Sequence, residues 1–334
     1  MDSVSQFALG AAVSVAVMGR RTAVWKAALW GGLAGTIPDL DSFIDFGDAV
    51  RNMTFHRGHS HGLFWLTLGA PVLAWIASRL GGGRALFKRW WLALWLALVT
   101  HPLLDTMTVY GTQLLQPFSE HPFALGSIFI IDPLYTVPLL VGLVVALARR
   151  AHRGLAWNRW GLALSCLYLG WSAAAQWHVR QIAEESLAAR GVQDAAVLVT
   201  PAPLNTVLWR VVAVKDDRFL EGFYSLLDPQ RSITFRAFDR GLPLYESLDH
   251  LWPVARMAWF SRGFFKMSEE HGQAFITDLR MGQEPGYVFS FRVARRGSGW
   301  QPAEPENLGW RGDVGRGIEW IWARMWDSDL PPLE

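Results

Sequence analysis

The chain has 334 residues, 51% of them apolar, with 19 tryptophans, a single cysteine and a formal net charge of +2. This apolar content is too high for an ordinary soluble enzyme, and one cysteine excludes both a disulfide framework and a cysteine metal knuckle. A nearly balanced charge gives no basic footprint, so no nucleic-acid partner is expected. The length leaves room for two domains.

The two halves of the chain differ in character. Residues 1–179 contain long apolar runs with 13 basic and 8 acidic residues, whereas residues 180–334 contain 18 basic and 21 acidic residues in an ordinary globular sequence. We therefore expect an α-helical multi-pass membrane domain over 1–179. A β-rich (α+β) soluble domain outside the membrane is expected over 180–334.

About six apolar helices are predicted in the first half, over residues 4–18, 22–37, 62–80, 88–104, 132–148 and 160–178. The last four are near the ~20 residues that a helix needs to cross a bilayer. The first two are about 15 residues long and rich in glycine. They fit either two short spans or a helical hairpin.

Basic residues concentrate in three connections between these segments: Arg20, Arg21 and Lys26; Arg79, Arg84, Lys88 and Arg89; Arg149, Arg150, Arg153 and Arg159. If six segments alternate across a bacterial-type inner membrane, the positive-inside rule places all three connections on the cytoplasmic face. Residues 38–61, residues 105–131 and everything after 180 then lie on the exoplasmic, periplasmic face.

Beyond residue 180, apolar residues alternate with polar ones, as is typical of strands. Strands are expected over 195–200, 206–214, 219–227, 232–238, 273–279 and 287–294, with turn residues between them. A short helix is expected at GIEWIWARMW, residues 317–326. Its tryptophans fit either core packing or a seat on lipid, and core packing is the commoner use.

Titratable side chains cluster in the first half. Seven of its eight acidic residues and five of the nine histidines fall between residues 38 and 132, on the face opposite the basic connections. Carboxylates and imidazoles at the mouth of a helical bundle are costly unless they pair or bind a cation. This cluster is the main functional signal in the sequence.

Two short motifs open the cluster. GTIPDLDS places Asp39 and Asp41 two residues apart after a helix end, as hard oxygen ligands or as capping and turn residues. HRGHSHG places His56 and His61 five residues apart, as metal ligands or as part of a polar interfacial loop. Arg57 suits a carboxylate or a phosphate through its planar guanidinium, or a snorkelling position at the lipid interface.

Two further motifs lie on helices. In THPLLDT, His101 and Asp105 are four residues apart, so on a helix they share one face and can bind one metal, or pair with each other as a satisfied core contact. Asp132 precedes Pro133, which is a helix-start signature. Capping and metal ligation by Asp132 are both compatible with this position.

Together these residues form a mixed nitrogen and oxygen ligand set without thiolates, which suits Zn²⁺ best and Mn²⁺ or Fe²⁺ as well. The set exceeds four candidate ligands. A site for two or more ions is therefore expected, of the kind that clamps both oxygens of an in-line displacement.

The ordered motifs PDLD, HRGxxH, HPLLD, YGTQLLQPFS and IIDPLYTVPLL resemble those of the YdjM-type inner-membrane metal-dependent hydrolases. The resemblance is close over residues 1–150 and looser beyond. It implies metal ligation by Asp39, Asp41, His56, His61, His101, Asp105 and Asp132, with Arg57 as a further polar motif residue. The motif order is also similar to zinc-dependent phospholipase C and zinc single-strand nucleases. However, no second HxxxE or HxxxD pair follows Asp105 in the first half, and Asp132 is only a partial substitute.

The resulting hypothesis is a membrane-bound hydrolase of phosphoesters that uses a metal-activated water, with Asp41, Arg57 and His101 as catalytic residues. A site at the bilayer surface favours a membrane lipid or lipid-linked substrate. A transporter or non-catalytic metal-binding membrane protein is the main alternative. It predicts charges deep within the spans, which the sequence lacks. A metalloprotease is disfavoured because HExxH is absent, and a scaffold with an unused histidine cluster remains as a further alternative.

Overall fold

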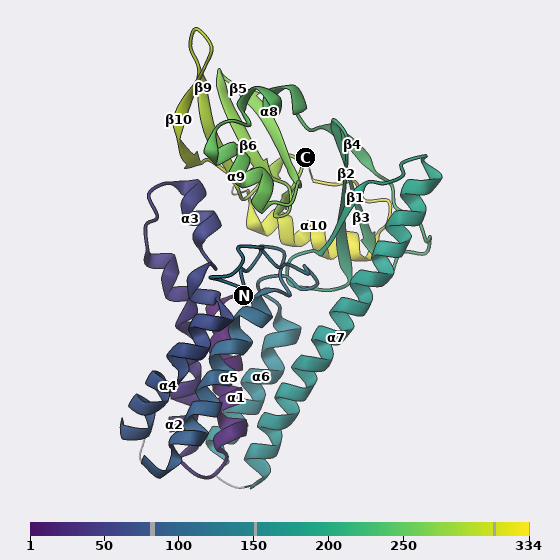
Figure 1. The fold of residues 1–334 in the computed structure, drawn as a ribbon. Coiled ribbons are helices and arrows are strands. Elements are labelled where there is room, and N and C mark those ends of the chain that lie inside the picture. Colours follow the sequence, from purple (N-terminus) through teal and green to yellow (C-terminus); the bar gives the residue numbers. More distant parts are fainter. Residues whose placement is uncertain (81–83, 150–151, 310–311, 334) are drawn as a thin grey trace. The chain divides into compact units, whose positions relative to one another are not determined.

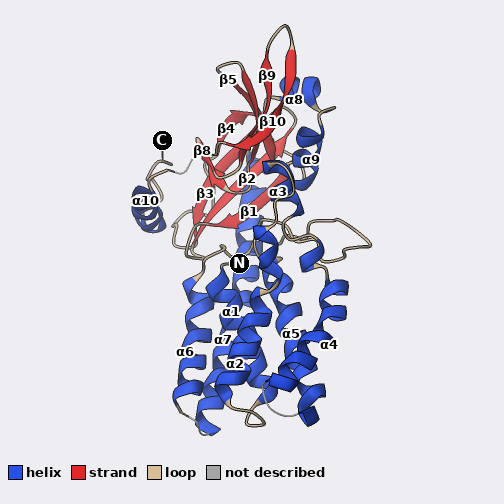
Figure 2. Cartoon of the chain, turned by 90° about the vertical axis from the view of Figure 1, so that its left-hand side faces the viewer, coloured by secondary structure: helices blue, strands red, loops and turns tan. Residues whose placement is uncertain are grey.

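The computed structural model describes residues 1–80, 84–149, 152–309 and 312–333. The chain forms two compact units. The first comprises Met1–Ile44 and His56–Ser172, and the second comprises Asp45–Phe55 and Ala173–Glu334. The fold class expected from the sequence, a helical N-terminal region followed by a β-rich domain with antiparallel sheets, is confirmed (Figures 1 and 2).

The first unit is a bundle of roughly parallel and antiparallel helices (Figure 2). Its helices are α1 (Ser3–Met18), α2 (Val24–Thr36), α4 (Leu63–Leu80), α5 (Phe87–Asp105), α6 (Pro133–Ala148) and the part of α7 (His152–Ala189) up to Ser172. Three short 3₁₀ turns accompany them: η1 (Pro38–Phe43), η2 (His59–His61) and η3 (Arg84–Leu86).

Small residues allow α1 and α2 to approach closely. A Cβ atom added to Gly10 would lie 2.3 Å from the carbonyl oxygen of Gly31 and 2.9 Å from Cα of Gly35, so no larger residue fits at Gly10. Stripes of small residues of this kind bring helix backbones together in membranes, where dispersion contacts replace the hydrophobic effect as the packing force. The same contact holds the C-terminal end of α2 beside α1, next to the candidate site.

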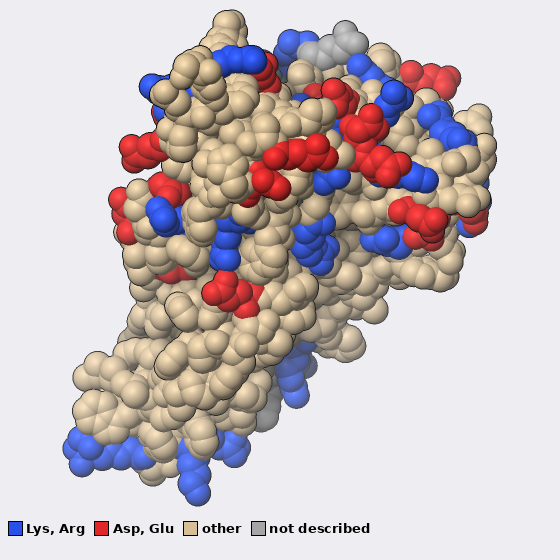
Figure 3. Space-filling view, turned by 45° about the horizontal axis from the view of Figure 1, so that its top comes forward, with Lys and Arg blue, Asp and Glu red and all other residues tan. Residues whose placement is uncertain are grey.

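The C-terminal ends of α1, α4 and α6 lie at the same end of the bundle as the N-terminal ends of α2, α5 and α7 (Figure 1). Basic side chains gather at this end of the helical unit (Figure 3). The opposite end carries η1, η2 and the C-terminus of α5. The basic residues near these helix ends and the candidate metal ligands are therefore separated along the length of the helices.

Among the described residues, one helix is both long and apolar enough to cross a membrane, namely α4. The apolar helices α1 and α6 have 16 residues each. They rise only about 24 Å, against a hydrocarbon core of about 30 Å. The multi-pass arrangement expected from the sequence is thus not established by helix length.

The second unit contains two four-stranded antiparallel sheets. The first has the order β1-β2-β3-β4, formed by Ala196–Pro201, Leu208–Lys215, Arg218–Ser225 and Arg236–Asp239. The second has the order β10-β9-β6-β5, formed by Trp300–Asn307, Ser290–Arg296, Gln273–Asp278 and Phe265–Glu270. A small ribbon pairs β7 (Gly282–Gln283) with β8 (Gly286–Tyr287), and helices α3 (Ala49–Phe55), α8 (Leu242–Leu248), α9 (Trp252–Phe260) and α10 (Val314–Trp326) complete the unit.

Two strands of the second four-stranded sheet were not expected from the sequence. Strands β5 and β10 are the edges of the second sheet, and the sequence of β10, WQPAEPEN, contains two prolines. Proline is tolerated in an edge strand because the N–H that it lacks would face solvent and have no partner in the sheet. Prolines also argue against a strand when a sequence is read for alternation, so β10 was not predicted. The strand expected from residue 232 begins only at Arg236.

The helix expected at residues 317–326 is present as α10, and its tryptophans have different environments. Trp320 is buried and makes an edge-to-face contact with Phe223, with ring centroids 4.9 Å apart. Trp322 and Trp326 are exposed on another face. Core packing therefore accounts for Trp320 alone.

A buried ion pair links the neighbouring strands β2 and β3 of the first sheet. Nε of Arg210 on β2 donates to Oε1 of Glu221 on β3 over 2.6 Å, and both side chains are almost fully buried. The same guanidinium donates to the carbonyl of Leu279 over 2.7 Å, and the other carboxylate oxygen of Glu221 accepts from the amide of Glu284 over 3.1 Å. These bonds satisfy a cation that would otherwise be buried without a partner.

Glu221→Gln leaves the Arg210 guanidinium buried without its counter-charge. We expect a loss of about 3–5 kcal/mol in the stability of the second unit. The measurement is the shift of the denaturation midpoint followed by tryptophan fluorescence in detergent. Glu269→Gln removes the partner of Arg296 in an exposed pair and is the matched control, with an expected loss of about 0–1 kcal/mol. Equal shifts for the two variants would contradict a structural role for the buried pair.

Candidate metal centre

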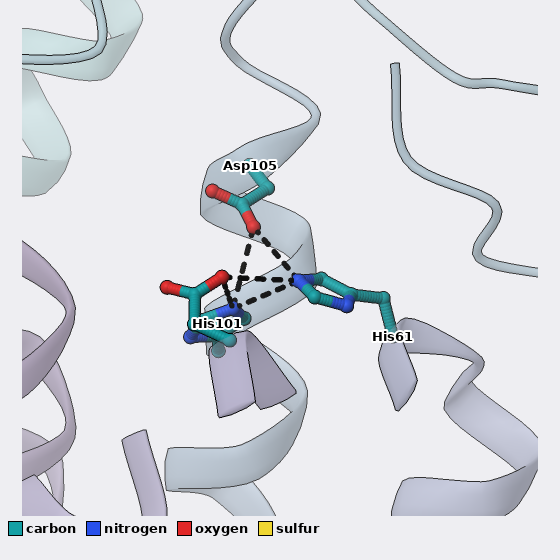
Figure 4. Close-up of side chains that lie close together, drawn as sticks. His61, His101 and Asp105 are labelled. Atoms are coloured by element: carbon teal, nitrogen blue, oxygen red, sulfur yellow. Dashed lines mark hydrogen bonds and ion pairs between the residues drawn. The ribbon is translucent and has the colours of Figure 1, made fainter. Parts of the chain in front are cut away.

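Four candidate ligands converge at one end of the helical unit: Asp39, His61, His101 and Asp105. Asp39 lies in η1 directly after α2, and His61 ends η2 before α4. His101 and Asp105 lie one turn apart on α5, which continues through Pro102, so both side chains leave the same face of the helix (Figure 4). One ligand atom from each of the four residues lies within 4.8 Å of all the others.

The spacing of these atoms matches a tetrahedral metal site. Nε2 of His61 lies 3.1 Å from Nε2 of His101, and each of these nitrogens lies 3.3 Å from Oδ2 of Asp105 (Figure 4). Oδ1 of Asp39 lies 3.5 Å from the His61 nitrogen and 3.4 Å from the His101 nitrogen. A tetrahedron with metal–ligand bonds of ~2.0–2.1 Å has edges of about 3.3–3.4 Å, so one Zn²⁺-sized ion fits between these atoms.

The other ring nitrogen of each histidine fixes the tautomer. Nδ1 of His101 lies 2.6 Å from the carbonyl oxygen of Gly35, which can only accept, so Nδ1 carries the proton and Nε2 presents a lone pair. Nδ1 of His61 lies 2.9 Å from Oγ of Ser60, whose hydroxyl donates to Asp41 over 2.5 Å and is left to accept. Both Nε2 lone pairs therefore face the centre, as metal-binding histidines require.

The burial of these side chains, and a carboxylate oxygen without a hydrogen-bond donor, support a cation at this point. The side chains of His61, His101 and Asp105 are inaccessible to solvent, and that of Asp39 is 20% exposed. Oδ1 of Asp105 accepts from Nε2 of Gln6 over 3.0 Å and contacts the amino group of Met1. Oδ2, on the side of the centre, accepts no hydrogen bond from any described residue. A buried carboxylate oxygen without a donor is costly, and two carboxylates with two neutral imidazoles match the charge of a divalent ion.

Asp41 and His56, both expected as ligands, lie outside this group of four. Oδ1 of Asp41 is 2.7 Å from Nδ1 of His56, and Oδ2 accepts from the backbone amide of Arg57 over 3.0 Å. Burial alone would raise the pKa of Asp41, but the hydrogen bonds from His56 and Ser60 outweigh it and hold that pKa below its usual value. Asp41 is thus an ionised support for the His56–His61 loop.

Asp132, also expected as a ligand, caps a helix instead. Oδ1 accepts from the backbone amides of Leu134 and Tyr135 over 3.0 and 3.4 Å, and Oδ2 accepts from the hydroxyl of Tyr168 over 2.8 Å. Both carboxylate oxygens are therefore engaged. The structure groups four ligand atoms among the described residues, which suits one ion, whereas two or more ions were expected.

Arg57 contacts the Asp105 carboxylate at Oδ1, the oxygen that faces away from the candidate centre. Its backbone has a left-handed φ of 61°, uncommon for a residue with a Cβ, and the guanidinium lies 3.4 Å from Oδ1 of Asp105. One terminal nitrogen donates to Oγ1 of Thr108 over 3.2 Å, and the group sits over the ring of Tyr110 at 4.9 Å. Its Nε is buried and has no acceptor among the described residues, so one donor is left for an anion.

Three supporting residues were not identified from the sequence: Gln6, Gly35 and Ser60. Gln6 is the one amide side chain in the first apolar segment, and its complete burial beside the carbonyl of His101 and the carboxylate of Asp105 explains its place there. The sequence did offer a signal for Gln6, because a single amide side chain in an apolar helix indicates a buried polar partner. Gly35 acts through its backbone, which leaves no signal in a residue pattern.

The family model for the YdjM inner membrane protein matches residues 1–179, which is more than half of the chain and includes all four candidate ligands. The uncharacterized protein YfhP of Bacillus subtilis (strain 168) is 31% identical over 134 residues. That match covers 39% of this chain and 39% of YfhP, so the similarity concerns well under half of either protein. No solved structure matches the chain. The chain belongs to the YdjM inner membrane protein family.

Proposed function

We propose that this protein is a membrane-bound, metal-dependent hydrolase of phosphoesters with a single divalent ion held by Asp39, His61, His101 and Asp105. The observation that supports the proposal is the set of five separations of 3.1–3.5 Å between ligand atoms of these four residues, which face one point. Zn²⁺ suits this ligand set and geometry best. When bound, such an ion would take a water as a fifth ligand beside the four side chains, lower the pKa of that water and orient it toward the ester.

The chain's own residues supply the remaining chemistry. The unpaired Nε of Arg57 can donate to a phosphoryl oxygen, because the buried guanidinium keeps that hydrogen free of protein acceptors. His56 is partly exposed, and Asp41 holds its Nδ1, so Nε2 is left to accept or deliver the proton that the reaction moves. In this proposal Asp41 acts indirectly, by orienting His56. His101 acts as a metal ligand.

We further propose that the helical unit crosses the inner membrane several times, with the metal centre at the exoplasmic surface. The basic connections all lie at the end of the bundle opposite the candidate ligands, and the positive-inside rule assigns a basic end to the cytoplasm. Residues that follow α7 then emerge on the exoplasmic side. Short helices such as α1 and α2 are accommodated where the bundle thins the bilayer locally.

The substrate we propose is a lipid or lipid-linked phosphoester. Exposed apolar side chains stand on the segments that carry the ligands: Leu40, Phe43 and Ile44 beside Asp39, and Phe64, Trp65 and Phe118 near His61. Phe118 is 77% exposed and meets Phe64 edge-to-face at 5.3 Å. This apolar rim suits the hydrocarbon part of an amphiphile whose phosphate reaches Arg57.

Detergent-purified protein is expected to contain about one equivalent of zinc, manganese or iron, because four ligands complete one tetrahedral site. His101→Ala should lower metal affinity by more than the ~10–100-fold that the loss of an outer partner causes. Elemental analysis after dialysis measures both. His121→Ala, at an exposed histidine outside the group, is the matched control and should keep full metal content. Wild-type protein that stays empty after reconstitution, or an equally loaded His101→Ala variant, would contradict the metal centre.

Arg57→Gln is expected to reduce kcat/KM on a phosphodiester panel by about 10²–10³, the usual loss for one donor to developing negative charge. Metal content should not change, because Arg57 is not among the four ligands. Arg57→Lys keeps the charge but loses the planar donor, so an intermediate rate is expected. Unchanged hydrolysis by Arg57→Gln would remove this residue from the mechanism. Metal-loaded wild-type protein that is inactive on the whole panel would instead favour a non-catalytic metal-binding protein or transporter.

Phe118→Ser should lower kcat/KM for a long-chain phospholipid in mixed micelles, while hydrolysis of a short, water-soluble phosphoester is unchanged. Each buried CH₂ contributes ~0.8 kcal/mol to binding, so the loss should grow with chain length. The control is Leu167→Ser, because Leu167 is similarly exposed at 70% but lies on α7 away from the ligand segments. A decrease in kcat/KM that is independent of acyl chain length would contradict the assignment of a lipid substrate.

A further inference from the structure

Residues 45–55 lie in the sequence between residues that form or support the candidate metal centre, yet they belong to the other compact unit. Asp39 and Asp41 precede this segment, and His56, Arg57 and His61 follow it. The segment itself, Asp45–Phe55, groups with Ala173–Glu334. Both of its ends are therefore covalently continuous with residues that form or support the candidate centre.

Helix α9 and strand β10 both pack against α3 in this segment, and α9 carries Trp252 and Arg256. The ring of Phe55 lies 6.3 Å from that of Trp252, and the guanidinium of Arg256 sits 5.1 Å over the same phenyl ring. Nε of Arg256 also donates to Oγ1 of Thr54 over 3.2 Å. Thr54 is fully buried. The last two residues before His56 are thus fixed from both sides by Trp252 and Arg256.

The earlier part of the segment is fixed by its own hydrogen bonds and by a stacked cation. Oδ1 of Asp45 accepts from the amide of Gly47 over 2.9 Å and from Nδ2 of Asn52 over 3.1 Å. Oδ1 of Asn52 accepts in turn from the amide of Phe46 over 2.6 Å. The guanidinium of Arg51 stacks 4.6 Å over the ring of Trp252. The segment is a single ordered piece with α9 as its anchor.

We propose that Trp252 and Arg256 are positioning residues for the metal centre and act through the segment 45–55. By ordering the segment up to Thr54 and Phe55, they fix the separation between its two ends, where the chain leaves Ile44 and resumes at His56. The loop from His56 to His61 then has less freedom to lose when a metal binds. Order that exists before binding raises affinity, because the entropy of ordering the loop is not lost again on binding. This inference rests on the metal centre proposed above, and it gives the second unit a role in that centre.

The experiment uses the full-length protein, stripped of metal and titrated with Co²⁺ as a spectroscopic probe. Trp252→Ala should bind Co²⁺ about tenfold more weakly, the loss typical of an outer partner, and should alter the visible absorption band of the tetrahedral ion. Trp252→Phe should restore both, since an aromatic ring against Phe55 is retained. Trp322→Ala is the matched control, because it removes an exposed tryptophan of the same unit that lies on α10.

Hydrogen exchange of the metal-free protein provides a second, independent readout. Residues 45–61 should exchange faster in Trp252→Ala and in Arg256→Gln, while the strands of the second unit keep wild-type protection. Wild-type Co²⁺ affinity together with unchanged exchange in both variants would overturn the positioning role and leave the metal centre standing. A wild-type protein that takes up no Co²⁺ would overturn the metal centre itself, and the positioning role with it.

Discussion

Four lone pairs directed at one buried point are the constraint on which the helical unit depends. Two imidazole nitrogens 3.1 Å apart and two carboxylates need positive charge among them, supplied by a metal ion or by a proton on an imidazole. These groups come from three separate segments, η1, η2 and α5. The C-terminal ends of α2 and α5 and the N-terminal end of α4 are therefore held close to the same point. The hydrogen bond between His101 on α5 and the carbonyl of Gly35 on α2 ties these two helices together beside the centre.

The surrounding polar residues share one physical task, which is to leave the inner atoms without protons or donors. Gly35 and Ser60 take the Nδ1 hydrogens of the two histidines. Gln6 and Arg57 engage only the outer oxygen of Asp105. The arrangement explains why polar groups are tolerated in an apolar bundle, since each one compensates a charge or lone pair of the centre.

Residue type and spacing were enough to predict the four residues that the structure groups as candidate ligands, but not to separate them from their neighbours. His101 and Asp105 followed from helical geometry alone, because four residues make about one turn. His56 and His61 could not be told apart, since the choice depends on the left-handed backbone at Arg57 and on the hydroxyl of Ser60. Asp132 was ambiguous for a related reason, as the partner of its second oxygen, Tyr168, is 36 residues away. In the second unit, central strands showed their alternation, while the proline-containing edge strand β10 did not.

The discontinuous second unit also has a consequence in time. Segment 45–55 leaves the ribosome roughly 200 residues before Trp252 and Arg256, a delay of about 10–40 s at ~5–20 residues per second. During that interval the apolar helices are already available for insertion, but the stretch between Asp41 and His56 has no anchor. If α9 orders this segment for the centre as proposed, maturation of the centre is a late event in biogenesis. A nascent chain arrested before α9 would carry every candidate ligand and still lack the contacts that order residues 45–55.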